Sequence, residues 1–288
     1  NNIAQVYEKK CDYGLALEYY AKTLQIWSVT LGLKHTNVAS VYFSIGDVLM
    51  GKGEYDNALE YFEKSLELRL NAFGEYNGTV ASCYEKIGTI FFIQKKFDSA
   101  EHFLYKNLIT KLAVFGENSP EAASANEKIA EINTAQGQYE KAVGFYLTAM
   151  RTVNTLFEKE TPQLGRLNFN IGVAYYKNEN YEKSIQFFNT SKQLFTSIFS
   201  SKHRYALEAK LWIAMSELKN NNLNQSLEML NEVLFSNLEN QLKASVYQNP
   251  SSKEFANRLL FENTGLVLLN TLESKAMALY QKYNHVQK

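Results

Sequence analysis

An Ile-Gly pair lies within Tyr42-Phe43-Ser44-Ile45-Gly46-Asp47-Val48-Leu49, and equivalents of this pair recur at one constant spacing along the chain. The first position of the pair contains Ile3, Ile45, Ile87, Ile129, Ile171 and Ile213. The second position contains Ala4, Gly46, Gly88, Ala130, Gly172 and Ala214. Six copies therefore share one register, and the chain is predicted to be a repeat array.

Further columns in the same register follow the pair. They contain Tyr13, Tyr55, Phe97, Tyr139, Tyr181 and Leu223, then Ala16, Ala58, Ala100, Ala142, Ser184 and Ser226, then Tyr20, Phe62, Leu104, Tyr146, Phe188 and Leu230. A last column, at the end of each copy, contains Leu31, Phe73, Phe115, Phe157 and Phe199. Small residues beside large ones allow two helices to approach closely, so each copy is predicted to pack as a helical hairpin.

The spacing within one copy has the period of a helix. Tyr55, Ala58, Leu59, Phe62 and Leu66 fall at i, i+3, i+4, i+7 and i+11, which is the apolar stripe of an amphipathic helix. The pairs Ser119-Pro120 and Thr161-Pro162 indicate helix starts, since a hydroxyl N-cap precedes Pro at the first helical position. We expect helices over 36–51 and 55–72, a turn at Gly51-Lys52-Gly53 between them, and equivalents in the other copies.

The pattern Tyr42-x-x-Ile45-Gly46-x-x-Leu49, then Tyr55, Ala58 and Phe62, resembles the tetratricopeptide repeat. Its 42-residue period is longer than the usual 34 of that family and is similar to the repeats of kinesin light chains. The resemblance implies an all-α fold, an α-solenoid in which helical hairpins form a right-handed superhelix. It also implies a protein-binding role, with the inner face lined by the first helix of each hairpin.

The repeat register divides the chain into two parts. Residues 1–235 contain six repeats, the first of them incomplete, and residues 236–288 are expected to form a linker and C-terminal capping helices. An insertion near 247–252 accounts for the loss of register, and a final helical pair is predicted over 253–283. Because an incomplete hairpin would leave an apolar face uncovered, we expect this chain to be part of a longer protein or array.

Composition excludes several classes of function. The net charge of +0 provides no field for nucleic acid or an anionic membrane, and no apolar run is long enough to span a bilayer. Cys11 and Cys83 form no C-x-x-C pair, and the four histidines are scattered, so we expect no metal site, no cofactor and no enzymatic activity. The isolated cysteines and the lack of a visible signal peptide favour the cytoplasm.

We expect the partner to lie against the inner face of the helices. By analogy with the family's geometry, the predicted groove consists of Phe43, Asp47, Glu85, Thr89, Glu127, Glu131, Arg166, Phe169, Val173, Tyr176, Leu211 and Met215, with Glu208 also facing inward. Its centre is acidic and its C-terminal part is apolar. Such a surface suits a protein or peptide segment that is basic in one part and apolar in another.

Three functions fit these features. The first is a scaffold within a larger cytoplasmic or cytoskeletal assembly, and the second is a motor or cargo adaptor that captures short linear motifs in its groove. The third is a regulatory array attached to a nucleotide-hydrolysing domain. The excess of Lys over Arg and the many Asn residues indicate an AT-rich genome such as that of a ciliate, which favours a ciliary or axonemal scaffold.

Overall fold

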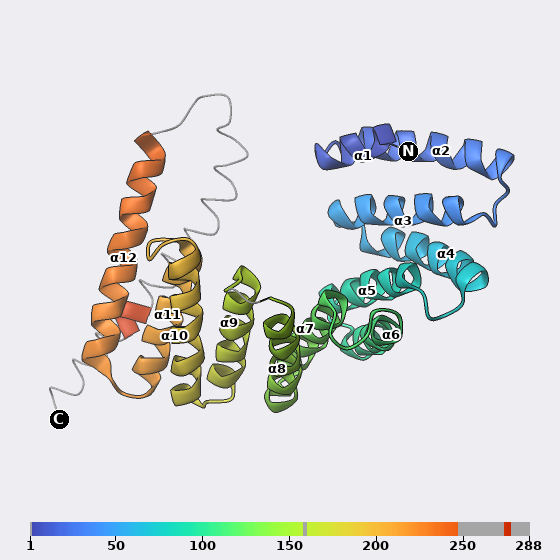
Figure 1. The fold of residues 1–288 in the computed structure, drawn as a ribbon. Coiled ribbons are helices and arrows are strands. Elements are labelled where there is room, and N and C mark those ends of the chain that lie inside the picture. The colour runs from blue at the N-terminus through green and yellow to red at the C-terminus, as the bar shows by residue number, and fades with distance from the viewer. Residues whose placement is uncertain (1, 158–159, 247–273, 278–288) are drawn as a thin grey trace. The chain divides into compact units, whose positions relative to one another are not determined.

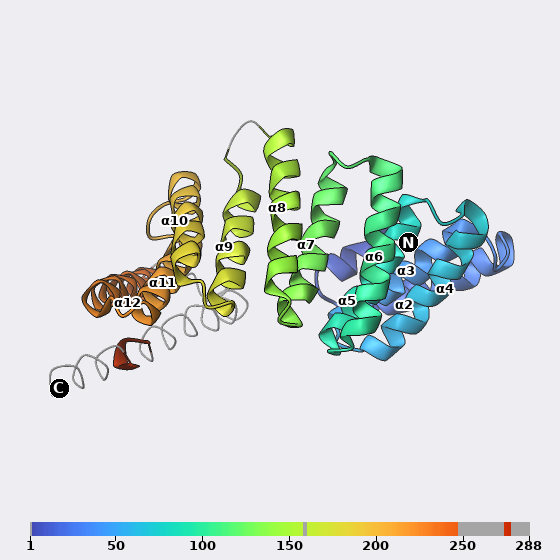
Figure 2. The ribbon, with the colours of Figure 1, turned by 90° about the horizontal axis from the view of Figure 1, so that it is seen from below.

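The computed structural model describes residues 2–157, 160–246 and 274–277, and every secondary-structure element in these ranges is an α-helix (Figures 1 and 2). The elements are α1 (Asn2–Lys9), α2 (Tyr13–Thr30), α3 (Thr36–Gly51), α4 (Tyr55–Phe73), α5 (Gly78–Ile93), α6 (Phe97–Phe115), α7 (Pro120–Ala135), α8 (Tyr139–Leu156), α9 (Pro162–Lys177), α10 (Tyr181–Ile198), α11 (Arg204–Lys219) and α12 (Leu223–Val246). The predicted all-α class and the helices expected over 36–51 and 55–72 are confirmed.

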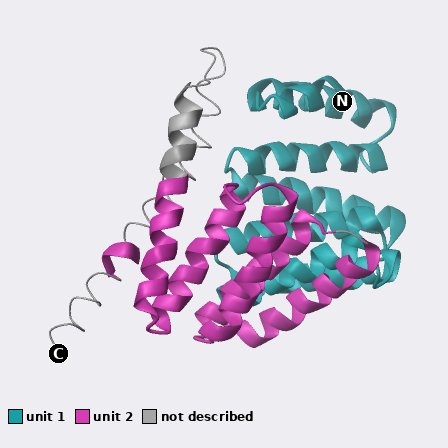
Figure 3. Ribbon diagram, turned by 60° about the vertical axis from the view of Figure 1, so that its left-hand side comes forward, with its two compact units in different colours: residues 1–136 teal, residues 137–288 magenta. Residues whose placement is uncertain are grey.

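The chain forms two compact units, residues 1–136 and residues 137–288 (Figure 3). The boundary lies in the turn between α7 and α8, inside the fourth repeat, and was not predicted. Within each unit, consecutive helices pack against one another as repeated hairpins. The capping pair predicted over 253–283 lies outside the described residues, apart from residues 274–277, which are helical. The division at residue 235 therefore stays a prediction.

The first helix of each hairpin begins at a side-chain cap that occupies one fixed position of the repeat. The caps are His35 to Asn37 N (3.1 Å), Asn77 to Thr79 N (2.8 Å), Ser119 to Ala122 N (3.1 Å), Thr161 to Leu164 N (3.3 Å) and His203 to Tyr205 N (3.4 Å). Each side chain accepts a hydrogen bond from a backbone N–H that has no partner within the helix. The two histidines of this column are therefore helix caps.

The turn inside each hairpin contains one residue in the left-handed conformation, again at one fixed position of the repeat. These residues are Cys11, Gly53, Lys95, Gly137, Glu179 and Asn221, with φ between 58° and 81°. Only two of them are glycine, although glycine is the residue that adopts this conformation without strain. The turn geometry is thus a property of the repeat, and the local sequence does not always favour it.

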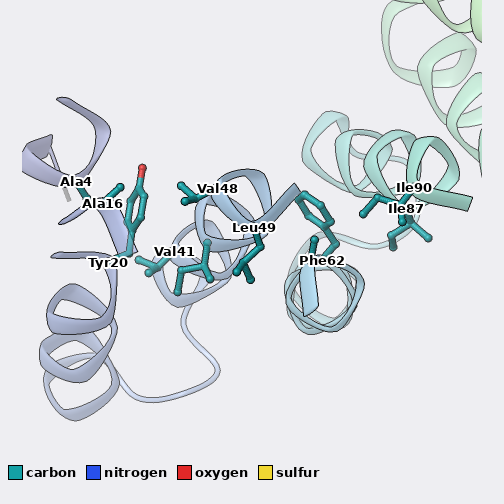
Figure 4. Packing of buried hydrophobic residues seen from close by; sticks show 11 residues of the cluster. Ala4, Ala16, Tyr20, Val41, Val48, Leu49, Phe62, Ile87 and Ile90 are labelled. Carbon is teal, nitrogen blue, oxygen red and sulfur yellow. The ribbon is translucent and has the colours of Figure 1, made fainter. Parts of the chain in front are cut away.

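The core of unit 1 runs between successive hairpins. Tyr20 lies between Ala16 of its own helix and Val41 and Val48 of α3, and the same cluster continues through Phe62 to Ile87 and Ile90 (Figure 4). Unit 2 contains a comparable cluster of Leu211, Ala214, Leu218, Leu230 and Val233 between α11 and α12. Ile3 differs from the other five isoleucines of its column, because its side chain is 55% exposed.

The small-residue column is where the paired helices come closest. A Cβ atom added to Gly46 would lie 2.8 Å from Phe62, and one added to Gly172 would lie 2.8 Å from Phe188. At Gly88 it would lie 2.7 Å from Leu104 Cγ. These distances are below any normal carbon–carbon contact, so the large side chain of the second helix occupies the space that a side chain would need.

The hairpins also share a buried polar contact. Ser65 Oγ donates to the Ala39 carbonyl at 2.7 Å, and Ser191 Oγ donates to the Gly165 carbonyl at 2.8 Å. Asn107 Nδ2 makes the equivalent bond to Ala81. Each bond joins the second helix to the first helix of the same hairpin and gives the donor group of a buried side chain its hydrogen-bond partner.

Replacing Gly88 with Leu should destabilise unit 1, because the new side chain has no space beside Leu104. Overpacking of this kind costs about 1–3 kcal/mol, which chemical denaturation would measure. Gly144→Leu is the matched control: Gly144 lies within α8 with nothing within 4 Å of the added Cβ. It should stabilise by up to about 1 kcal/mol through helix propensity. Equal effects at both positions would contradict the repeat packing described above.

Candidate functional site

The acidic part of the predicted groove belongs to unit 1, and its carboxylates are already paired. Asp47 lies 2.6 Å from Lys86 Nζ, Glu85 lies 2.6 Å from Lys111 Nζ, and Glu131 lies 3.0 Å from Lys128 Nζ. Lys111 reaches Glu85 from α6 and is itself buried. Each of these three carboxylates is therefore paired with a lysine of the chain, and the acidic groove stays a prediction.

The other predicted residues of unit 1 are also occupied within the chain. Glu127 is only 3% exposed and interacts with other residues, so it offers no surface. Thr89 Oγ1 donates to the Glu85 carbonyl at 2.7 Å. The ring of Phe43 packs edge-on against Phe62, with centroids 5.2 Å apart, and the Arg69 guanidinium lies 4.6 Å from its centroid.

Unit 2 contains a cavity of about 520 Å³ between the N-terminal halves of α9 and α11. Its lining consists of Pro162, Gln163, Arg166, Phe169, Phe195, Tyr205 and Glu208. The structure thus brings together the predicted residues Arg166 and Phe169 with Glu208. A volume of this size is in the range of sites that hold a small molecule or a few side chains of a peptide.

Two local features of the sequence open this cavity. Thr161 caps α9 and Pro162 occupies its first turn, so the helix begins at the cavity mouth. Gly165 lies against Phe195, whose ring would be 2.8 Å from a Cβ at that position. In the same column the other first helices contain Ala39, Ala81, Ala123 and Leu207. Gly165 therefore lets the α10 ring reach α9.

Aromatic rings hold the cavity wall in place. The Phe169 ring packs edge-on against Phe188 and Trp212, with centroids 5.3 Å and 6.2 Å apart. Trp212 also contacts Tyr176 at 5.2 Å, and burial raises the pKa of the Tyr176 phenol. Trp212 of α11 thus packs against the preceding hairpin. Edge-to-face pairs of this kind add to the free energy of packing, so the wall is preformed.

Glu208 is the carboxylate of the cavity lining. Burial raises the pKa of its side chain, while the charge of Arg204 partly opposes that shift. Within the part of the chain that the structure describes, its carboxylate makes no hydrogen bond or ion pair. A half-buried carboxylate without a partner is unfavourable for folding.

The remaining predicted residues of unit 2 lie outside the lining of this cavity. Val173, Tyr176 and Met215 are half-buried, and Met215 packs against the apolar cluster between α11 and α12. Leu211 is only 3% exposed and belongs to that cluster, so a partner cannot contact it. Two of the predicted positions, Glu127 and Leu211, are thus buried residues and not surface residues.

Phe195 and Tyr205 line the cavity but were not predicted as site residues. Phe195 lies in the second helix of its hairpin, and the prediction considered only first helices. Gly165, a glycine in a column of larger residues, was the available signal for it. Tyr205 follows the His203 cap closely and shares no residue type with Asn37, Thr79 and Gln163 in its column, so the repeat gave no signal.

A second cavity of about 550 Å³ in unit 2 lies among α8, α9 and α10. Its lining is mainly apolar and amide side chains, from Met150, Asn154, Phe157, Glu160, Leu164, Asn168, Thr190 and Leu194. The carboxylate of Glu160 already accepts a hydrogen bond from Ser197. The carboxylate in this lining is therefore already hydrogen-bonded within the chain, unlike that of Glu208.

The described residues provide little for catalysis. No group of three or more His, Cys, Asp or Glu side chains in these ranges is arranged to hold a metal ion. Burial raises the pKa of the Cys83 thiol, which disfavours the reactive thiolate. No helix in the described ranges combines the length and the apolar character needed to cross a membrane.

The sequence matches the tetratricopeptide repeat family over residues 1–69, 38–108 and 120–197. No curated protein matches it significantly. Among solved structures, BtubC (BKLC) from P. vanneervenii is similar, with 20% identity over 68% of this chain and 78% of that chain and a TM-score of 0.63.

Two further structures show the same fold. A putative kinesin light chain with TPR-like repeats from Podosopora anserina has 14% identity over 72% of this chain and 98% of that one, with a TM-score of 0.64. The apo form of RapI has 16% identity over 87% of this chain and 99% of that one, with a TM-score of 0.61. At these identities the likeness establishes the architecture alone.

Replacing Glu85 with Ala should destabilise unit 1, because it leaves the Lys111 ammonium buried without a partner. We expect a loss of about 2 kcal/mol, measured by chemical denaturation. Glu60→Ala is the matched control: it breaks the exposed Glu60–Lys64 pair of α4 and should cost less than about 1 kcal/mol. A Glu85 variant as stable as the Glu60 variant would show that the Glu85–Lys111 pair contributes nothing.

Replacing Glu208 with Gln should stabilise unit 2 at neutral pH. Since the folded state raises the pKa of Glu208, this group favours folding below its unfolded pKa, and the benefit is lost as the pH rises through the folded pKa. The melting temperature of the variant should therefore exceed that of wild type near neutral pH. The difference should disappear below about pH 4, where the unfolded glutamate is also protonated.

The charged and titratable groups around Glu208 are Arg166 from α9 and Arg204 and Tyr205 from α11, while α10 contributes only the ring of Phe195. Glu182→Gln, at an exposed position of α10, is the control and should show no such pH-dependent difference. A Glu208 variant less stable than wild type at neutral pH would mean that the carboxylate has a stabilising partner.

Proposed function

Because the chain belongs to the tetratricopeptide-repeat family, we propose that it is a non-enzymatic module that binds another protein or a peptide segment through unit 2. Members of this family are generally protein–protein interaction scaffolds. The observation that carries the proposal is the cavity between α9 and α11, which combines a preformed aromatic wall with an unpaired carboxylate. The lack of a metal-binding or reactive cluster among the described residues agrees with a role in binding.

The binding surface comprises the exposed residues of α9 and α11 around this cavity. Arg166 lies on the exposed side of α9, and Tyr205 of α11 is 38% exposed although its ring lines the cavity. Val173, Tyr176 and Met215 extend the half-buried apolar surface along the same two helices. A partner that lies along α9 and α11 can insert one or two side chains into the cavity.

We place the protein in a larger assembly, as a scaffold subunit. The support comes from unit 1, where Asp47, Glu85 and Glu131 are all paired with lysines, so that this face stabilises the chain itself. Composition supports a cytoplasmic or cytoskeletal location, with a ciliary or axonemal assembly as the most specific form of the proposal. The alternative is a motor or cargo adaptor, favoured by the likeness to putative kinesin light chain repeats.

The double variant Arg166→Glu, Tyr205→Ala should lose its partners in a pull-down from native cell extract, because it reverses a charge and removes a ring at the cavity mouth. We expect the recovery of specific partners to fall at least tenfold, measured by quantitative mass spectrometry. Circular dichroism should show unchanged helical content, since both positions are partly or fully exposed.

The matched control is Arg151→Glu, Phe235→Ala, which makes the same changes at exposed positions of α8 and α12. It should retain the partners. If both variants retain the partners equally well, the α9–α11 surface is not the binding site. Recovery of a stoichiometric complex would favour the scaffold, and release of the partner by a short peptide would favour the adaptor.

A further inference from the structure

The α9–α11 cavity places a carboxylate next to three aromatic rings. Glu208 and Tyr205 come from α11, Phe169 comes from α9, and Phe195 comes from α10. Tyr205 and Phe195 are in contact, with ring centroids 5.0 Å apart. The cavity therefore combines an aromatic, apolar part with the carboxylate of Glu208, and Gln163 and Arg166 complete its polar lining.

This combination favours a cation with an apolar stem. The faces of aromatic rings attract a cation within about 6 Å, and the attraction is stronger where water is excluded. A carboxylate that is removed from water without a hydrogen-bonding partner regains favourable interactions when a cation binds beside it. Glu208 is in this position, since it makes no hydrogen bond or ion pair with any residue that the structure describes.

The chain's own cations near the cavity leave this role unfilled. Arg204 lies on the ring of Tyr205, 4.9 Å from its centroid, and acts on Glu208 only through its charge. Arg166 also lines the cavity, and its side chain is not free, because it already takes part in an interaction within the protein. A carboxylate, an aromatic wall and available volume thus remain for a group supplied from outside.

We propose that this cavity binds a lysine or arginine side chain of the partner, with its cationic group at Glu208 and its stem among Phe169, Phe195 and Tyr205. The inference rests on the proposed function and names the chemistry that the site recognises. The basic residue that we expect in the partner thus binds to unit 2, and not to the lysine-paired carboxylates of unit 1. The volume of about 520 Å³ leaves space for an apolar neighbour of the basic residue.

Small probes of the side chain test this directly on the full chain. n-Butylguanidinium and n-butylammonium represent arginine and lysine, while n-pentanol and pentanoate are the neutral and anionic probes of similar length. Trp212, which packs against Phe169, provides a fluorescence readout next to the cavity. We expect both cations to bind at least tenfold more tightly than pentanoate, a difference of about 1.4 kcal/mol.

Glu208→Gln should reduce the affinity for the cations to that of n-pentanol, whereas Glu182→Gln, at an exposed position of α10, should leave it unchanged. Binding of the cations should also weaken as the pH falls and Glu208 becomes protonated. The other charged or titratable groups near it are Arg166, Arg204 and Tyr205. Unchanged cation affinity in Glu208→Gln, or pentanoate binding as tightly as the cations, would overturn the inference.

The outcome separates this inference from the proposed function. In one outcome, the cations bind no more tightly than pentanoate while the Arg166→Glu, Tyr205→Ala variant still loses its partners. In that case the surface binds proteins, but the inference that it recognises a basic side chain is wrong. If the cations bind through Glu208 but the double variant retains every partner, the recognition chemistry stands and the proposed protein-binding surface fails.

Discussion

The close approach of paired helices is the constraint on which the hairpins depend. A glycine in the first helix and a large side chain in the second share one space, as Gly46 does with Phe62 and Gly172 with Phe188. Neither residue can be enlarged without moving a helix, because protein interiors are close-packed. The constant register of the repeats follows from this contact, since each hairpin must place a small residue opposite a large one to form the same packing.

The same constraint builds the candidate site. Gly165 admits the ring of Phe195 beneath α9, and Phe188, fixed by Gly172, packs against both Phe169 and Trp212. The cavity wall is therefore an extension of the hairpin core. Glu208 is the exception, because burial raises the pKa of its carboxylate and the charge of Arg204 opposes that shift only in part. A buried carboxylate that lowers the stability of the fold is expected where its role is to bind a ligand.

Much of the fold could be predicted, because several copies of the repeat show the same residue types at the same positions. An exceptional residue in one copy therefore does not hide the pattern. The helices at 36–51 and 55–72 followed from apolar spacing, and Ser119 and Thr161 were recognisable caps. The caps at His35, Asn77 and His203 were missed because different residue types perform one task, accepting a backbone hydrogen bond.

The groove was less predictable, since Lys111 reaches Glu85 from the opposite helix of the hairpin and neutralises it. Likewise, Leu211 faces the core although its position resembles an inner-facing one.

Site-specific photo-crosslinking in cells can show whether a partner lies against α9 and α11. A photoreactive phenylalanine analogue at position 166 would be compared with the same analogue at position 151, an exposed arginine of α8. We expect the analogue at position 166 to form a discrete crosslink to a partner segment that contains a basic residue. The analogue at position 151 should form no crosslink to this partner. Crosslinks from position 151 alone, or equal products from both positions, would contradict this expectation.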